Sequence, residues 1–425
     1  MRRVLIFVAL VAAFGWFAYI AQHRSRSVGG SDSSGYFNEA NMLASGNLRM
    51  IIPSPDFIPL GFRQVSWDQM APLYPPGYPL HVALFGRFAF LVTPIAALIC
   101  LLLMFALARS FGLSDGLAIA SALILATVPA FLLMSLQPMS DVVSLMWCMV
   151  AMLFAVRRWP VLAGVAFSIA VWVRPSNLLL AIPLALVLRR RSSIAAIAAL
   201  PLGIALVIFN HAMYGDWFTT GYGAFYSMMT TNSHALFYAR WLLLYLAGAL
   251  VVFDRDVASP TRVLLIAWFG VFFLFYSFFE PIGDWGYTRF LLPAIPALII
   301  GLMLMLRRQR VLATLLIVVI AFTGMHFARR QHIFSIQRTE SVYPQTIAWA
   351  QQHVPQNATI ASMQLSGAFL YYANRFTLRY DLAKEIPPNT YAVIFDWEEP
   401  LLPGRWKRVE RFKGGSLMQF DDVLR

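Results

Sequence analysis

Carboxylates stand beside apolar stretches at several places in the chain. Asp32 lies in a polar segment after the first apolar stretch, and Glu39 follows it seven residues later. Asp141 comes just before another long apolar stretch. A carboxylate in a partly desolvated pocket can take a proton from an acceptor hydroxyl near neutral pH. The chemistry open to such residues is therefore general base catalysis, and Asp32 is the first candidate.

These acids also have structural interpretations. If the segment is helical, Asp32 and Glu39 lie on one face, and apolar residues such as Phe37 and Ala40 fall near helical spacing. This pattern is typical of an amphipathic helix on a membrane surface, in which Asp32 would stabilise the positive end of the helix. Asp141 likewise fits the start of a helix, where it or the preceding serine would cap the first turn.

Any cation that binds phosphate within the membrane part must be Arg, or His if protonated. Of the 33 basic residues only three are lysines, and all three lie near the C-terminus. Arg suits this task, because its planar guanidinium fork binds phosphate oxygens in pairs. Arg174, which precedes a proline, either extends to the lipid headgroups or points into an internal cavity, and Arg289 could likewise anchor the protein at the headgroups.

The composition is that of a polytopic membrane protein. Hydrophobic residues make up 59% of the chain and charged residues only 12%, whereas soluble proteins carry about 25% charged residues. The net charge of +13 does not indicate nucleic-acid binding, because the basic residues punctuate the apolar stretches. Cys100 and Cys148 both lie inside apolar stretches, so we expect no disulfide. The seven histidines show no ligand spacing, so no metal site is expected, and no cofactor is required, although a divalent cation stays open.

The apolar stretches predict about eleven transmembrane helices, since one upright span needs ~20 residues. Eleven crossings place all five interior arginine clusters and the N-terminal arginines on the cytoplasmic side. The same count places the loop 23–76 and the C-terminal region outside. The predicted stretches are 4–20, 77–108, 114–135, 142–156, 160–173, 176–188, 193–212, 237–253, 263–279, 290–306 and 311–327.

The chain divides into two predicted parts. Residues 1–328 form the transmembrane module with its outer loop 23–76, and residues 329–425 form a small α/β domain outside the membrane. In the second part charges return and Pro, Asn and Gly punctuate short elements. We expect helices over 343–353 and 367–373, and strands over 359–362, 391–395 and 416–420. The predicted fold class is therefore an all-α polytopic membrane protein with a small C-terminal α/β domain.

Taken in order, several short motifs resemble one family. They are similar to the polytopic, polyprenyl-phosphosugar-dependent glycosyltransferases of the GT-C superfamily, in the branch with protein O-mannosyltransferases, aminoarabinose transferases and bacterial sugar transferases. The likeness covers essentially the whole chain. Its motifs are Asp32-x3-Tyr36-x3-Ala40-x2-Leu43-x2-Gly46, Tyr74-Pro75-Pro76-Gly77-Tyr78-Pro79-Leu80, Ser140-Asp141, Gly164-x9-Arg174-Pro175, Tyr214-Gly215-Asp216 and Tyr287-Thr288-Arg289-Phe290-Leu291-Leu292-Pro293.

The resemblance implies that Asp32 is the catalytic base and that Asp141 lies at the same site. The chain departs from the family at two positions. Many relatives have Asp-Glu at the first motif, where this chain has Asp32-Ser33. Some have a lysine before the Pro-Pro pair that contacts the lipid phosphate, where this chain has Tyr74. An arginine would then have to replace that lysine.

The expected function is transfer of a sugar from a polyprenyl-phosphate donor to an acceptor hydroxyl at the outer face of the bacterial inner membrane. The acceptor is a glycan, a lipid or a protein, and inversion at the anomeric carbon is expected. A transporter or flippase, and a polysaccharide polymerase or ligase, are the alternatives. The expected substrate-binding residues are Tyr36, Glu39, Arg63, Tyr74, Arg174, Tyr287 and Arg289, although outer tyrosines also serve as an interfacial belt.

Overall fold

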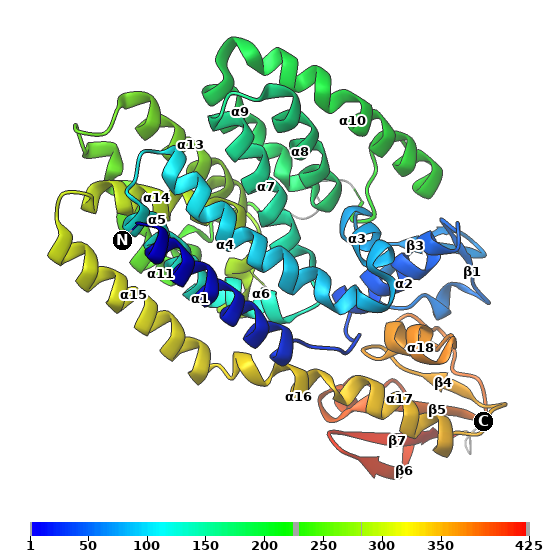
Figure 1. Cartoon of the computed structure of the whole chain (residues 1–425). Coiled ribbons are helices and arrows are strands. Elements are labelled where there is room, and N and C mark those ends of the chain that lie inside the picture. Colours follow the sequence, from blue (N-terminus) through cyan, green and yellow to red (C-terminus); the bar gives the residue numbers. More distant parts are fainter. Residues whose placement is uncertain (1, 224–228, 282, 422–425) are drawn as a thin grey trace. The chain divides into compact units, whose positions relative to one another are not determined.

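The computed structural model describes residues 2–223, 229–281 and 283–421 and is mostly helical (Figure 1). The chain divides into two compact units. We call the first the helical unit; it comprises Met1–Arg24, Phe90–Leu206 and Phe225–Ile336. We call the second the mixed unit; it comprises Ser25–Ala89, Val207–Ala224 and Gln337–Arg425.

The helical unit consists of helices that lie over the predicted apolar stretches. They are α1 (Arg2–His23), α4 (Val92–Ser110), α5 (Asp115–Thr127), α6 (Pro129–Leu136), α7 (Ser140–Val156), α8 (Pro160–Val173), η3 (Pro175–Leu180), α9 (Ala181–Leu188), α10 (Ser192–Tyr214), α11 (Ala235–Trp241), α12 (Leu243–Leu246), η6 (Ala247–Phe253), α13 (Ser259–Tyr276), η7 (Trp285–Ala294), α14 (Ile295–Leu306) and α15 (Arg310–Arg330). The last residues of α10, from 207 on, belong to the mixed unit.

Within the part of the chain that the structure describes, six helices are long and apolar enough to cross a membrane, and the number rises to eight if each of two bent pairs is one span. The first pair, α5 and α6, bends by 65° at Pro129, which cannot continue the hydrogen-bond ladder of α5. The second pair bends by 86° between α11 and the helix that follows it. Helices α7 and α8 are apolar but shorter. The predicted eleven crossings and their orientation therefore stay a prediction.

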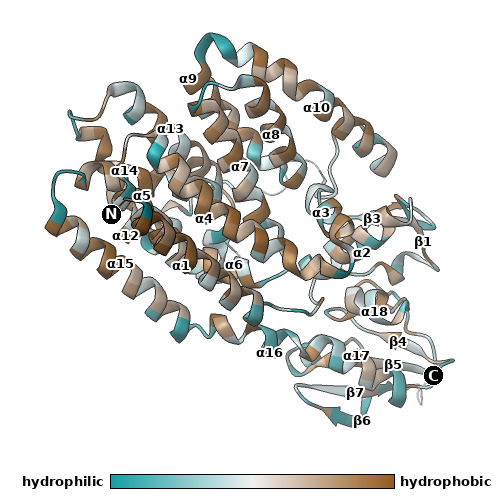
Figure 2. Ribbon diagram, in the orientation of Figure 1, coloured by the Kyte–Doolittle hydropathy of each residue, from teal (hydrophilic) through white to brown (hydrophobic). Residues whose placement is uncertain are grey.

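The helices differ in how far their apolar side chains are buried. In α14 nearly every side chain is buried, and most of α7 is buried as well. In contrast, α1, α10 and α15 expose many large apolar side chains, and Figure 2 colours most of these three helices as hydrophobic. Exposed apolar faces of this size are the surfaces that bilayer lipids cover.

The mixed unit contains the segment in which Asp32 lies. Helix α2 (Asp32–Ala44) is followed by a three-stranded antiparallel sheet and then by α3 (Gly77–Phe85). The sheet has the order β1-β3-β2, formed by β1 (Met50–Ile51), β3 (Gln69–Pro72) and β2 (Phe62–Ser66).

The C-terminal part of the mixed unit combines short helices with a second sheet. The helices are α16 (Ile336–Glu340), α17 (Val342–His353) and α18 (Ser366–Ala373). The sheet has the order β4-β5-β7-β6, in which only β4 and β5 are parallel. Its strands are β4 (Thr359–Ala361), β5 (Thr390–Phe395), β6 (Trp406–Phe412) and β7 (Gly415–Phe420). The expected helices and strands lie at these positions, β6 was not expected, and the domain boundary at 329 stays a prediction.

Candidate active site

Asp32 is the first residue of α2, and its carboxylate is bound by a tyrosine from the loop between β3 and α3. The Tyr74 hydroxyl donates to Asp32 Oδ1 at 2.7 Å. The Ser31 hydroxyl lies 2.8 Å from the same Tyr74 oxygen. Because the single Tyr74 proton is directed at Asp32, the Ser31 hydroxyl is the donor in this second contact. Burial raises the pKa of Tyr74 far above its ordinary value, so its hydroxyl stays protonated and remains a donor.

Tyrosines pack around this hydrogen bond. The Tyr36 ring lies 4.5 Å from the Tyr74 ring and 4.9 Å from the Tyr78 ring, centre to centre. Tyr222 contacts Tyr74 edge to face at 5.9 Å. The structure therefore brings Asp32, Tyr36 and Tyr74 together, as expected for residues of one site.

Helix α2 is not the surface helix that its spacing allowed. Nine of its 13 residues are buried, and it packs against α3 on one side and α18 on another. Asn38 donates to the Gly367 carbonyl of α18 at 2.9 Å. The amphipathic surface interpretation is therefore wrong, because elements distant in the sequence cover the face that would have met solvent or lipid.

Glu39 is fully buried in α2, and neither of its carboxyl oxygens has a hydrogen-bond partner among the described residues. Burial raises the pKa of Glu39 well above its ordinary value, which favours the neutral acid. Tyr214 lies within electrostatic range of Glu39.

The Arg63 guanidinium lies 5.7 Å from the centre of the Tyr214 ring and donates to the Thr220 carbonyl at 3.0 Å. This hydrogen bond of Arg63 holds the segment that follows α10.

Asp141 and Arg174 form an ion pair inside the helical unit. Arg174 Nη2 lies 2.8 Å from Asp141 Oδ1, and the two side chains are 13% and 1% exposed. Arg174 Nε also donates to Ser140 Oγ at 3.2 Å. Neither Asp141 oxygen accepts a well-aligned hydrogen bond among the described residues. The capping interpretation is wrong, because the N-cap residue of α7 is Met139 and Asp141 lies inside the helix. The Arg174 side chain is directed at the buried Asp141 carboxylate.

The second candidate arginine lies close to the first. The guanidinium carbons of Arg174 and Arg289 lie 5.3 and 5.1 Å from the centre of the same Phe290 ring. Tyr287 contacts that ring at 5.6 Å, and Tyr276 stacks on it at 5.3 Å. Asp141, Arg174, Tyr287 and Arg289 therefore belong to one cluster of the helical unit.

Some site residues were missed. Asn177 is fully buried and donates to Ser144 Oγ at 2.8 Å and to the Ala170 carbonyl at 2.7 Å. Tyr276 donates to Ser176 Oγ at 2.7 Å. The available signal was a polar residue within an apolar stretch. Among the residues the structure describes, no three His, Cys, Asp or Glu side chains gather as a metal site would require.

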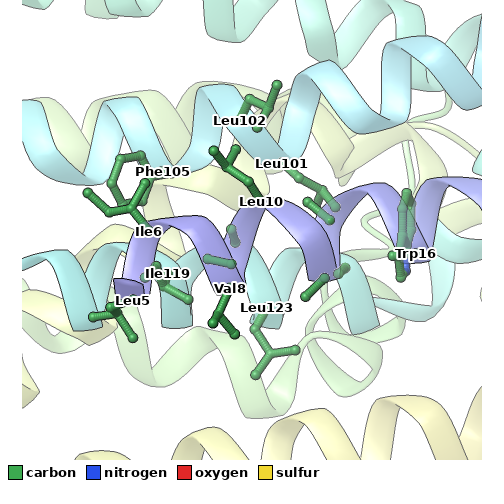
Figure 3. A pocket seen from close by; sticks show the side chains of 15 residues that line it. Leu5, Ile6, Val8, Leu10, Trp16, Leu101, Leu102, Phe105, Ile119 and Leu123 are labelled. Carbon is green, nitrogen blue, oxygen red and sulfur yellow. The ribbon is translucent and has the colours of Figure 1, made fainter. Parts of the chain in front are cut away.

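A pocket of about 400 Å³ in the helical unit lies among α1, α4 and α5 (Figure 3). All of its lining residues are apolar, including Leu5 and Trp16 of α1, Phe105 of α4 and Leu123 of α5. With no charged or hydrogen-bonding lining apart from the Trp16 indole, this pocket suits a hydrocarbon chain and not a sugar or a phosphate.

Comparisons with known proteins place the fold. No family model matches the sequence, and no curated protein matches it. Among solved structures, the chain is similar to ArnT from Cupriavidus metallidurans bound to undecaprenyl phosphate, with a TM-score of 0.63 and 15% identity, over 98% of this chain and 97% of that one. The apo state of the same protein gives a TM-score of 0.60.

The chain is also similar to the arabinofuranosyltransferase AftD from Mycobacteria, with a TM-score of 0.59 and 14% identity. This match covers 97% of this chain but only 38% of AftD. Both likenesses extend over essentially the whole of this chain, and they concern its fold.

Proposed function

We propose that this chain is an integral-membrane glycosyltransferase that moves a sugar from a polyprenyl-phosphate donor to an acceptor hydroxyl. The observation that carries the proposal is the end-to-end likeness of fold to a protein bound to undecaprenyl phosphate. AftD, an arabinofuranosyltransferase, shares this fold, which favours an enzyme over a transporter or flippase. The proposed location is the bacterial inner membrane, with the N-terminus in the cytoplasm and residues 329–425 outside.

Asp32 is the proposed general base of a single displacement. The acceptor oxygen attacks the anomeric carbon while Asp32 takes the hydroxyl proton. The bond from the anomeric carbon to the phosphate oxygen breaks on the opposite side, so the configuration inverts and the polyprenyl phosphate leaves. The position of Asp32 at the first residue of α2, with its carboxylate held by a protonated tyrosine, supports this role.

Arg174 and Arg289 are the proposed phosphate ligands. Both guanidiniums lie over the Phe290 ring, and the planar guanidinium fork matches the geometry of phosphate oxygens. A fixed cation in a water-poor site stabilises the charge that develops on the leaving phosphate. The proposed role of Asp141 is to hold Arg174 and to accept a hydrogen bond from a sugar or acceptor hydroxyl.

The remaining expected residues differ in their contacts, and we assign them different roles. Tyr36 packs against Tyr74, the partner of Asp32, and Tyr287 packs against Phe290. Each is a proposed substrate contact. Glu39, as a neutral buried acid without a described hydrogen-bond partner, is a proposed donor to a substrate hydroxyl. Arg63 is engaged with backbone carbonyls, which favours a structural role.

The test is transfer of radiolabelled sugar from synthetic polyprenyl-phosphate donors by the full-length protein in lipid nanodiscs. Asp32→Asn should abolish product formation, because the amide cannot take the proton, although its oxygen can still accept the Tyr74 hydrogen bond. The matched control is Asp68→Asn, an exposed acid in the same loop, which should keep wild-type activity. Full activity in Asp32→Asn would contradict the base assignment. Movement of the labelled lipid across liposomes without product would identify a flippase.

Arg289→Ala tests the phosphate site separately. The variant should raise the KM for the donor by at least tenfold, because a charge-assisted contact to phosphate is lost. An unchanged dependence on donor concentration would remove Arg289 from the phosphate site, while the base assignment would stand.

A further inference from the structure

We infer that Tyr74 is a positioning residue for Asp32, and that it is not a contact for the lipid phosphate. Its hydroxyl, together with that of Ser31, holds the carboxylate in one orientation at the start of α2. This inference rests on the proposed function, because it assigns a role within the same site. It also gives Tyr74 a different role from that of the lysine found at this position in some proteins of similar sequence pattern.

The hydrogen-bond geometry is the first argument. The Tyr74 oxygen lies 2.7 Å from Asp32 Oδ1 and 2.8 Å from Ser31 Oγ. The phenol therefore joins two consecutive residues where α2 begins. Since the phenol has a single proton and the carboxylate receives it, no donor remains for a phosphate oxygen.

The packing of the Tyr74 ring is the second argument. The side chain is only 4% exposed. A Cβ added to Gly35 would stand 2.3 Å from Tyr74 Cε2, so only glycine lets the ring lie against the backbone of α2. Gly61, at φ +87°, also approaches this glycine, and a Cβ added to Gly61 would be 2.7 Å from Gly35 Cα. The ring is thus fixed on several sides, and its direction sets that of the hydroxyl.

Charge is the third argument. A lysine beside the phosphate would offset its negative charge, whereas a protonated phenol carries no charge. A phosphate drawn to the Tyr74 hydroxyl would also approach the Asp32 carboxylate, and the two negative groups would repel. A neutral donor is instead the right partner for a carboxylate base, because it fixes the orientation of the carboxylate without adding a charge beside it.

The experiment compares Tyr74→Phe with wild type in nanodiscs, with initial rates measured against pH and donor concentration. The carboxylate loses a hydrogen-bond donor, so the acidic limb of the kcat profile should move to higher pH. The KM for the donor should change less than twofold. A raised KM with an unmoved pH profile would show that Tyr74 contacts the phosphate and would overturn the inference.

Two further variants separate positioning from general packing. Ser31→Ala, which removes only the outer hydroxyl, should move the acidic limb in the same direction by a smaller amount. Tyr391→Phe on β5 removes a phenol hydroxyl elsewhere in the mixed unit and should leave the profile unmoved. An equal shift in Tyr391→Phe would overturn the inference.

An infrared titration keeps the inference testable if no donor is turned over, an outcome that would defeat the proposed function. The protonated-carboxyl band of Asp32 is identified by its absence in Asp32→Asn. In Tyr74→Phe this band should persist to a higher pH than in wild type. An unmoved band would overturn the role of Tyr74 whether or not the protein transfers sugar.

Discussion

The buried ion pair of the helical unit gives the sharpest stability prediction. Arg174 and Asp141 lie 2.8 Å apart and are 13% and 1% exposed. At that separation and an effective dielectric constant of ~20, their attraction is about 6 kcal/mol, before the cost of taking both charges out of water. Arg174→Gln leaves the carboxylate buried without its cation, so it should lower the free energy of unfolding by about 3–5 kcal/mol.

The assay is unfolding of the full-length protein in mixed micelles, with three variants compared to wild type. Asp141→Asn should cost a similar amount, since it leaves the guanidinium unpaired. The double variant, Arg174→Gln with Asp141→Asn, should lose much less than the two single losses together, because no uncompensated charge remains. If the double loss equals that combined loss within about 0.5 kcal/mol, the two residues are not coupled and the reasoning is refuted.

An exposed pair provides the matched control. Arg308 and Asp256 also form an ion pair, but their side chains are 71% and 53% exposed. Arg308→Gln should lower the free energy of unfolding by less than about 1 kcal/mol, because water already solvates both charges. The same chemical change thus has a large effect in one pair and a small one in the other, and burial is the difference.

Three further predictions concern the mixed unit. Burial raises the pKa of Glu340 from 4.5 to about 7. Glu340→Gln should therefore match wild type in stability below pH ~4.5 and be more stable above pH ~7, by up to about 3 kcal/mol. Equal stability of the two proteins at pH 8 would contradict this. A Cβ at Gly367 would stand 2.1 Å from Ser34 Oγ and 2.8 Å from its Cβ, so Gly367→Ala should cost about 1–3 kcal/mol of unfolding free energy, and adding Ser34→Gly should restore it. Glu39→Leu replaces a buried carboxyl without a described hydrogen-bond partner by an apolar side chain, so it should not lower the Tm; a loss of several degrees would show that the carboxyl is bonded.

The elements of the fold were predictable where local pattern determines them. The apolar stretches became helices, and the expected helices over 343–353 and 367–373 lie at α17 and α18. Strand β6 was missed because it lies at the edge of its sheet with exposed charged side chains and no apolar alternation. Charged side chains on an edge strand prevent it from pairing with other chains. The same charged side chains remove the apolar alternation by which a strand is predicted from sequence.

The partners within the site were less predictable, because they depend on contacts between distant residues. The types of Asp32, Asp141 and Arg174 identified them as candidates. Their partners did not follow, since Tyr74 lies 42 residues from Asp32. Asp141 looked like a helix cap because its pairing with Arg174 requires the end of the following helix to return beside it.

The segments that form the mixed unit are far apart in the sequence, so the ribosome synthesises them at different times. Asn38 of α2 bonds to Gly367, which is 329 residues away, and Val28, just before the helix, bonds to the hydroxyl of Tyr372. At ~5–20 residues per second, synthesis of that interval takes roughly 16–66 seconds. Throughout this time the helix that begins at Asp32 has α3 and Tyr74 as neighbours but lacks α18, which packs against it in the finished protein. The packing around α2 is therefore completed only after the C-terminal segment has been made.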